Sequence, residues 1–287
     1  MSPNPTNDRD HDRDRDRDVM IECRDLSVGH DDLPILEHVD LKIRRGEIVV
    51  FLGSSGSGKS TLMRTLVGLL PPIAGDVNFL GESLYGVDSP TREKLLGRSG
   101  MVFQHDALFG SMTVGDNVAL PLRELRNMPE PMVKELVRVQ LAMMGLPGVE
   151  DRAPDTLSGG ERKRAALARA SVNDPEIIFG DEPSAGLDPS VGAQVDEALL
   201  RLRDTFGTTI IIVTHEMESV RRIADRIVMF GRGGITAKGT YDELMNSTDD
   251  DIYNFFHRVA ASPNTNHNHR SADRAVSSPE AVAARGA

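Results

Sequence analysis

The chain contains 287 residues, 39% of them hydrophobic and 27% charged, which is the composition of a globular protein with one sizeable core. Its formal net charge of −11 at pH 7 argues against non-specific nucleic-acid binding, because such binding depends on cationic patches that contact phosphates. A single cysteine excludes an intrachain disulfide, and no apolar run approaches the roughly 18 residues that cross a bilayer. The charged N-terminus lacks the apolar segment of a secretory signal, so we expect a cytoplasmic protein without nucleic-acid partners.

Both ends of the chain are predicted to be disordered tails, residues 1–18 and residues 261–287. Acidic and basic residues alternate in the first, and the second is rich in Ser, Asn, Ala and Arg, compositions that do not build a packed core. Histidines in the tails could suggest metal binding, but a disordered segment fixes no coordination geometry. These histidines are His11, His267 and His269. Between the tails no internal repeat occurs, which predicts a single folded unit, residues 19–260.

The folded unit is predicted to begin with two short β-strands, residues 19–23 and 36–43, followed by a buried strand, residues 47–52. Two more apolar runs of strand length lie far downstream, residues 176–180 and 208–213, each next to a helical pattern. Continuous apolar strands that alternate with helices indicate a parallel sheet covered on both faces. The sequence therefore predicts an α/β fold.

Residues 113–170 have a mostly helical pattern, in which apolar side chains such as Met132, Leu136, Val139 and Met143 recur at helical spacing. The methionines could suggest a soft-metal or lipid site, but core packing explains the same spacing. We therefore expect a helical subdomain.

Residues 53–60 read GSSGSGKS and match the phosphate-binding pattern GxxxxGK[ST], directly after the buried strand and before a predicted helix, residues 61–70. Glycines let backbone N–H groups curl around phosphate oxygens, and a helix N-terminus adds partial positive charge. Lys59 is predicted to reach the β- and γ-phosphates, and the hydroxyl of Ser60 to bind Mg²⁺. A Gly/Ser-rich loop without function is the alternative. The predicted nucleotide-binding residues are Gly53, Ser54, Ser55, Gly56, Ser57, Gly58, Lys59, Ser60 and Thr61.

A later apolar strand ends in two acidic residues, Asp181 and Glu182. Strand ends beside a phosphate loop are where α/β sheets bind ligands. We expect Asp181 to bind Mg²⁺ directly or through water and Glu182 to polarise the attacking water. Alone, such a pair could equally cap a helix or lie on the surface. His215 follows the next strand and is predicted to contact the γ-phosphate and steady the water, although a lone histidine is usually structural.

Residues 157–161 read LSGGE and precede an Arg/Ala-rich helix, residues 162–170. Ser-Gly-Gly alone is a helix cap with a flexible lead-in, but the whole string resembles the signature motif, LSGGE or LSGGQ, of the ATP-binding subunits of ABC transporters. In that family the motif contacts the γ-phosphate held by the other subunit, so each ATP is sandwiched between two chains. The resemblance implies such a role for Ser158, Gly159 and Gly160, and a second copy of the chain as partner.

The resemblance covers residues 20–258, and other family motifs follow in order. Gln104 matches the Q-loop glutamine, which touches Mg²⁺ or water and links to the helical subdomain. Asp188 ends SAGLD, which matches the D-loop that crosses the dimer interface and contributes to the nucleotide site. Where the family usually stacks an aromatic residue on adenine, this chain has Gly29 and His30, and His30 could stack or be a plain loop residue.

The family fold implied by these motifs is that of a P-loop NTPase with a RecA-like parallel core sheet. An antiparallel β subdomain and an inserted helical subdomain, about residues 105–172, complete it. The implied cofactors are ATP and Mg²⁺. The implied catalytic residues are Glu182 as base, His215, Gln104 and Lys59, and the implied metal-binding residues are Ser60, Gln104 and Asp181.

The stretch from residue 104 to residue 124 looks like the ATPase of Mce/Mla-type phospholipid transport systems, which share the pattern FQxxALFxxMTVxDNVAxPLRE. Residues 239–244 and 252–256 are also similar to that group. Because the helical subdomain of the family receives the coupling helix of the permease, its sequence should follow the partner. Helix capping and core packing, common to any importer, are the alternative explanation.

The resemblance thus implies an ATP-hydrolysing subunit that dimerises on ATP at the cytoplasmic face of the inner membrane. Its implied partners are an integral membrane permease and, through it, a periplasmic Mce-type lipid-binding protein. One alternative is the ATPase of a transporter for a small polar solute. Another is a non-transport ABC ATPase, which the single nucleotide-binding unit and the lack of a heptad run disfavour.

Overall fold

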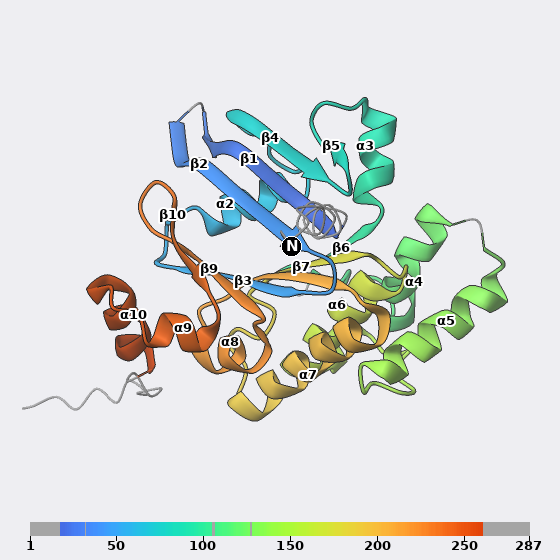
Figure 1. Ribbon diagram of the computed structural model, residues 1–287. Helices are drawn as coiled ribbons and strands as arrows, with labels where there is room; N and C mark the ends of the chain where they lie inside the picture. Colours follow the sequence, from blue (N-terminus) through green and yellow to red (C-terminus); the bar gives the residue numbers. More distant parts are fainter. Residues whose placement is uncertain (1–17, 32, 105–106, 127, 261–287) are drawn as a thin grey trace, which may run out of the picture.

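The computed structural model describes residues 18–260, with gaps at residue 32, residues 105–106 and residue 127 (Figure 1). Almost all of the two predicted tails, with His11, His267 and His269, lies outside the described residues, as do two residues of the lipid-transport pattern, His105 and Asp106. Among the helices that are described, none is both long enough and apolar enough to span a membrane.

An antiparallel sheet of strand order β2-β1-β4-β5 forms the upper layer in Figure 1. Its strands are β1 (Val19–His30), β2 (Leu33–Arg44), β4 (Ala74–Phe79) and β5 (Glu82–Ser83). The first two strands run further than the sequence predicts because pairing continues past an irregularity between Cys23 and Leu26, and Leu26 and Val28 are again fully buried. The antiparallel subdomain expected from the sequence is confirmed.

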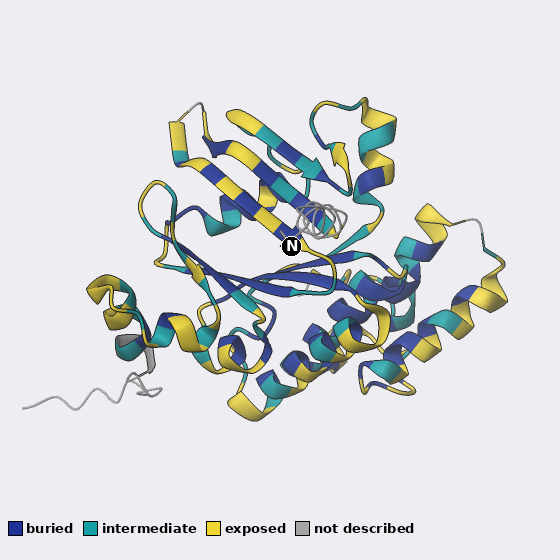
Figure 2. Cartoon of the chain, in the orientation of Figure 1, coloured by how far each residue is buried: buried dark blue, intermediate teal, exposed yellow. Residues whose placement is uncertain are grey.

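A six-stranded sheet of order β10-β9-β3-β8-β7-β6 forms the middle layer. Its strands are β3 (Ile48–Gly53), β6 (Ser99–Val102), β7 (Ile177–Asp181), β8 (Thr209–Val213), β9 (Arg226–Phe230) and β10 (Ile235–Gly239). All neighbouring pairs are parallel except β9 and β10, which are antiparallel. The predicted parallel core sheet is confirmed. Its central strands are buried on both faces (Figure 2), and their side chains are therefore mostly apolar.

Successive residues of the core strands belong to two different hydrophobic clusters. Val49 and Phe51 pack with the antiparallel sheet and α2 (Lys59–Leu66), whereas Val50 and Leu52 pack with the helices below. This alternation follows from the two-residue period of a strand. The remaining helices are α3 (Ser89–Leu96), α4 (Val114–Leu125), α5 (Glu130–Met143), η1 (Pro154–Thr156), α6 (Gly159–Ser171), α7 (Pro189–Phe206), α8 (Met217–Ile223), α9 (Tyr241–Met245) and α10 (Asp250–Ala260).

The helix after the phosphate loop is shorter than the sequence predicts. We expected residues 61–70, but α2 ends at Leu66. Gly68 takes a left-handed conformation, φ +76°, and its N–H donates to the carbonyl of Thr65. A left-handed glycine just past the last turn is a common helix stop, and the apolar residues beyond it had masked this signal.

Candidate nucleotide-binding and hydrolysis site

A cavity of about 510 Å³ opens at the carboxyl ends of β3, β7 and β8. Residues far apart in the sequence line it, because parallel strands end at the same edge of the sheet. The lining residues predicted from the sequence are Gly53, Ser55, Gly56, Gly58, Lys59, Ser60, Thr61, Gln104, Asp181, Glu182 and His215. The structure therefore brings every predicted catalytic and metal-binding residue to one cavity.

Two glycines of the phosphate loop cannot be replaced without a clash. Gly53 has φ +146°, and a β-carbon there would lie 2.2 Å from the carbonyl oxygen of Phe230. Gly58 has φ +92°, and its β-carbon would lie 2.6 Å from Leu36 Cγ. Both values of φ are in the range that glycine alone adopts readily, so the loop can lie close to the strands on either side.

The N-terminus of α2 opens directly into this loop. Its N-cap, Gly58, supplies no side chain to the first-turn N–H groups, and groups of this kind bind anions. The ammonium of Lys59 donates to the carbonyls of Gly53 and Ser54, both at 2.8 Å, and to Ser57 Oγ at 3.2 Å. Burial lowers the pKa of Lys59, and the charges of Glu182 and Asp181 oppose this shift. The loop thus places the ammonium group of Lys59 where a triphosphate would lie.

The acidic side of the cavity is built by the end of β7. Asp181 is half-buried, and burial, followed by the charge of Glu182, raises its pKa. Ser60 and Gln104 lie in the same cavity and add a hydroxyl and an amide oxygen. Mg²⁺ prefers such hard oxygen ligands. The residues present therefore fit a magnesium ion.

Glu182 is held in an unusual backbone conformation, with φ +52°. Its N–H donates to the carbonyl of Val213 at 2.8 Å, and its Oε1 accepts a hydrogen bond from His215 Nδ1 at 2.7 Å. Its other oxygen, Oε2, is buried and has no hydrogen-bond partner in the described part of the chain. A left-handed non-glycine residue is strained and is found at functional sites. A buried, unpaired carboxylate oxygen is an acceptor for a water or an ion.

Several predicted residues lie outside this cavity. The signature serine, Ser158, is the N-cap of α6: its Oγ accepts from Glu161 N at 3.3 Å and its N–H donates to Glu161 Oε2 at 2.8 Å. The others that do not line the cavity are Gly159, Gly160 and Asp188, together with Ser54 and Ser57 of the phosphate loop. The signature serine and glycines of a chain therefore do not line that chain's own cavity.

The sequence reading missed two lining residues, Ile35 and Val213. His30, the residue considered for base stacking, ends β1 exposed and does not line the cavity. Ile35 is one of several aliphatic residues in β2, a strand of mixed polar and apolar residues whose pattern does not distinguish Ile35 from core residues, so no signal in the sequence could have singled it out. Val213 is likewise the last residue of a buried strand.

This cavity contains backbone amides that can bind phosphate oxygens. It also contains carboxylates that can bind a metal ion and a water molecule. This is the chemistry of a P-loop nucleoside triphosphatase. A family model described as ABC transporter matches residues 36–185, and the chain belongs to this family. It is an ABC ATPase, which hydrolyses ATP for transport.

Three curated relatives are similar over most of the chain. The Arabidopsis thaliana protein TRIGALACTOSYLDIACYLGLYCEROL 3, chloroplastic, is 39% identical, over 83% of this chain and 73% of its own length. The Haemophilus influenzae intermembrane phospholipid transport system ATP-binding protein MlaF is 35% identical, over 80% of this chain and 87% of its own length. The Ralstonia nicotianae methionine import ATP-binding protein MetN is 36% identical, over 77% and 64%. These names do not single out one substrate.

Solved structures of related proteins share the fold. CbiO1 of Clostridium perfringens, described as part of the ABC transporter complex cbiONQ, aligns with a TM-score of 0.74 at 29% identity, over 79% of this chain and 91% of its own. A bacterial ABC transporter cassette solved as a dimer aligns with a TM-score of 0.70 at 30% identity, over 77% and 98%. The same cassette is also known in a post-hydrolysis state bound to ADP and Pi.

Proposed function

We propose that two copies of this chain close around two ATP molecules and drive a membrane permease that moves phospholipid. One observation carries the dimer: a single chain has a complete phosphate loop but places Ser158, Gly159 and Gly160 outside the cavity. The signature segment of one copy would then complete the site of the other. A related cassette that is itself a dimer supports this arrangement.

The site residues predicted from the sequence have distinct roles in the proposal. The loop amides and Lys59 bind the β- and γ-phosphates, while Glu182 orients and deprotonates the attacking water. His215, bonded to Glu182 Oε1, keeps that carboxylate in place and contacts the γ-phosphate. Ser60, Gln104 and Asp181 would hold Mg²⁺, which when bound neutralises charge on the phosphates. Asp188 lies at the start of α7 and would contribute across the interface.

The lipid assignment is supported by two relatives whose names concern lipids, and the position of the permease by two exposed aromatic side chains. MlaF and TRIGALACTOSYLDIACYLGLYCEROL 3 are similar over most of this chain. The segment between the core sheet and α4 carries two aromatic side chains that are exposed to solvent, Phe103 at 41% and Phe109 at 51%. We place the permease against this segment, with the chain on the cytoplasmic face of the inner membrane and a periplasmic Mce-type protein beyond the permease.

A Glu182→Gln variant tests the ATPase dimer. It keeps the shape of the side chain and removes the base, so we expect turnover to fall by about 10²- to 10⁴-fold while ATP binding remains. With ATP and Mg²⁺ the variant should elute as a dimer in size-exclusion chromatography. The matched control is Glu218→Gln on α8, an exposed glutamate that does not line the cavity. Undiminished hydrolysis in Glu182→Gln would contradict the assignment of Glu182 as the base. A variant that stays monomeric with ATP bound would contradict the proposed dimer.

A transporter for a small polar solute is the second candidate, since the methionine importer MetN is as similar as the lipid relatives. The two candidates differ in what activates the purified complex of the chain with its permease. Phospholipid transport predicts co-purifying phospholipid, identified by mass spectrometry, and ATPase activity that rises with phospholipid. A lipid-free complex stimulated by methionine or another solute would favour the second candidate.

A further inference from the structure

The segment between β6 and α4, which contains Gln104, is hydrogen-bonded near its C-terminal end to a buried side chain. Asn117 of α4 is fully buried. Its Oδ1 accepts from Phe109 N at 2.7 Å, and its Nδ2 donates to Phe109 O at 3.1 Å and to Thr113 O at 2.9 Å. This end of the segment is therefore fixed to the helix that follows it.

Near its N-terminal end the same segment is hydrogen-bonded to side chains of α6. Lys163 is only 6% exposed, and its ammonium donates to the backbone carbonyl of Gln104. Six residues later on the same helix, the guanidinium of Arg169 donates to the carbonyl of Ala107 at 2.7 Å. Burying a cation costs free energy unless it is well bonded, so two such contacts from one helix to one segment call for a role.

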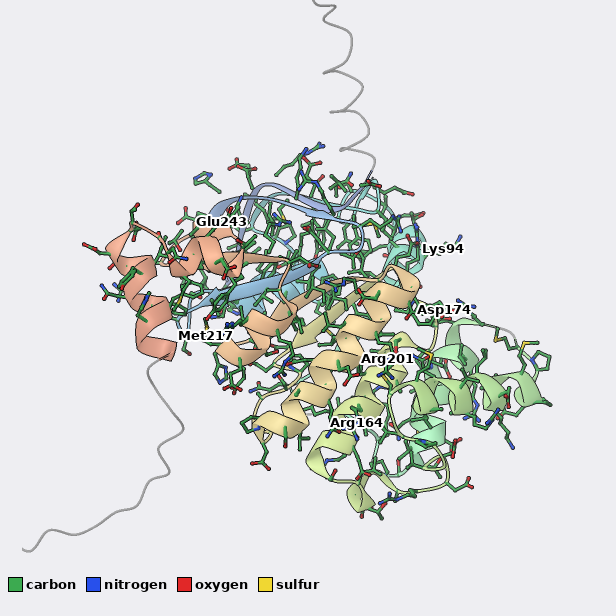
Figure 3. The ribbon with its side chains drawn as sticks, turned by 60° about the horizontal axis from the view of Figure 1, so that its bottom comes forward. Lys94, Arg164, Asp174, Arg201, Met217 and Glu243 are labelled. Carbon is green, nitrogen blue, oxygen red and sulfur yellow. The ribbon has the colours of Figure 1, made fainter. Side chains whose placement is uncertain are left out.

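Helix α6 is itself held as a rigid body. Its first turn is closed by the capping box of Ser158 and Glu161, and its middle residues, from Ala165 to Ala168, are buried. On the face shown in Figure 3, Arg164 of α6 donates to Gln194 of α7 at 2.5 Å. At Gly160 a β-carbon would lie 2.1 Å from Val191 Cγ1, so the side chain of Val191 on α7 packs directly against the backbone of α6. The position of Lys163 is therefore set by the packing of α6.

We infer that Lys163, assisted by Arg169, positions Gln104 for ATP hydrolysis. The helix that begins at the signature segment thereby also determines where Gln104 stands in the cavity of its own chain. This inference rests on the proposed function, in which Gln104 contacts the metal or the water. Lys163 does not line the cavity, so in this inference it acts on the reaction through the backbone carbonyl of Gln104.

Lys163→Met tests the inference, because it keeps the length of the side chain and removes the ammonium. In the purified full-length chain we expect kcat to fall on the order of 10- to 100-fold, the usual effect of a misplaced catalytic group. The Kd for ATP should change less than about threefold, because the phosphate loop is untouched. Lys134→Met is the matched control, since this lysine lies exposed on α5 of the same region. Lys163→Arg should recover part of the lost kcat.

A double-mutant cycle with Gln104→Ala separates positioning from a merely structural role. Once the glutamine side chain is gone, nothing is left for Lys163 to position, so adding Lys163→Met should lower kcat by less than about twofold. If the double variant lowers kcat by the product of the two single fold-changes, the inference is overturned. A kcat for Lys163→Met within threefold of wild type would also overturn it. If Lys163→Met lowers the melting temperature strongly, Arg169→Met enters the same cycle with the same expectations. Failure of the proposed role of Gln104 is distinguishable, because Gln104→Ala alone would then leave kcat unchanged.

Discussion

At the scale of single residues, the site depends on backbone conformations that only its surroundings can hold. Gly53 leaves β3 with φ +146°, against the carbonyl of Phe230 on β9. Glu182 leaves β7 in the left-handed region and is tied to Val213 of β8. Both residues lie where a strand becomes a loop, and the neighbouring strand fixes each of them. Gly53 allows the backbone to approach the phosphates without strain, whereas Glu182 is a strained residue where the water must be approached.

Replacing Gly53 with alanine should therefore damage both stability and binding. The new β-carbon would lie 2.2 Å from Phe230 O, so β3 or β9 must shift. We expect a loss of at least about 2 kcal/mol in the free energy of unfolding, measured by urea titration, together with loss of ATP binding. Gly110→Ala is the control, because a β-carbon there meets nothing within 4 Å. An alanine variant that binds ATP normally would contradict this account of the loop.

At the same scale, the identity of the phosphate and metal residues could be read from the sequence, whereas Ile35 could not. Lys59 and Ser60 stand in a pattern whose spacing is dictated by the phosphate groups. Ile35 is one of many aliphatic residues in the first two strands, and it reaches the cavity only because β2 lies over the phosphate loop. Such a contact depends on the packing of strands and leaves no local pattern.

At the scale of elements, the N-terminus of α6 is capped by side chains of its own first turn. Its capping box satisfies the backbone around Ser158 within the chain. The charge of Glu161 also suits the positive end of the helix. The hydrogen bond from Ser158 N, with help from the Ser158 hydroxyl, holds the pKa of Glu161 below its usual range. The cap therefore makes a contribution to stability that depends on pH.

The sign of this dependence can be tested with Glu161→Gln. Because the folded pKa is lowered, the unfolded chain binds more protons between the two pKa values. The contribution is fully present above the unfolded value of about 4.3 and is lost as pH falls through the folded value. The variant should be less stable than wild type by about 0.3–1 kcal/mol at pH 7, and this gap should close below pH 4. Urea unfolding at several pH values measures it; a gap that stays constant would contradict the assignment.

The existence of elements was easier to predict than their ends. Strands β3, β7 and β8 of the core sheet and the helix after LSGGE were expected from apolar runs and a cap, and all of them are present, whereas β9 and β10 were not predicted. Helix α2 was expected to reach residue 70 but ends at Leu66, because a left-handed Gly68 stops it. Apolar residues continue past that glycine as packing residues, so periodicity alone overstates the helix.

At the scale of the whole molecule, one sheet separates two hydrophobic clusters. Phe51 faces the antiparallel layer and packs against Phe230, with ring centroids 5.2 Å apart. Ile212 faces the helical layer. Both residues are fully buried, and both lie on central strands that pair with each other. The two clusters pack on opposite faces of the same sheet. A substitution that destabilises one cluster therefore also destabilises the sheet on which the other cluster packs.

Calorimetry on Phe51→Ala and Ile212→Ala tests this sharing. Each variant should lose about 2–5 kcal/mol of stability, and each should lower the temperature of the same single transition, because the two layers unfold together. Leu125→Ala, at a side chain 58% exposed, should change stability by less than about 0.5 kcal/mol. Two separate transitions, with Phe51→Ala moving only one of them, would show that the layers fold independently.

The amino-acid order by itself determined the α/β class, the phosphate loop and the acidic strand end, because each depends on residues that are neighbours in the chain. The family also followed from a local string, LSGGE, and the family model matches it. Tertiary structure alone decided that Ile35 lines the cavity, that Ser158 lies outside it and that Lys163 holds the carbonyl of Gln104. These contacts join segments tens of residues apart. The packing of layers sets such distances, and no local pattern encodes them.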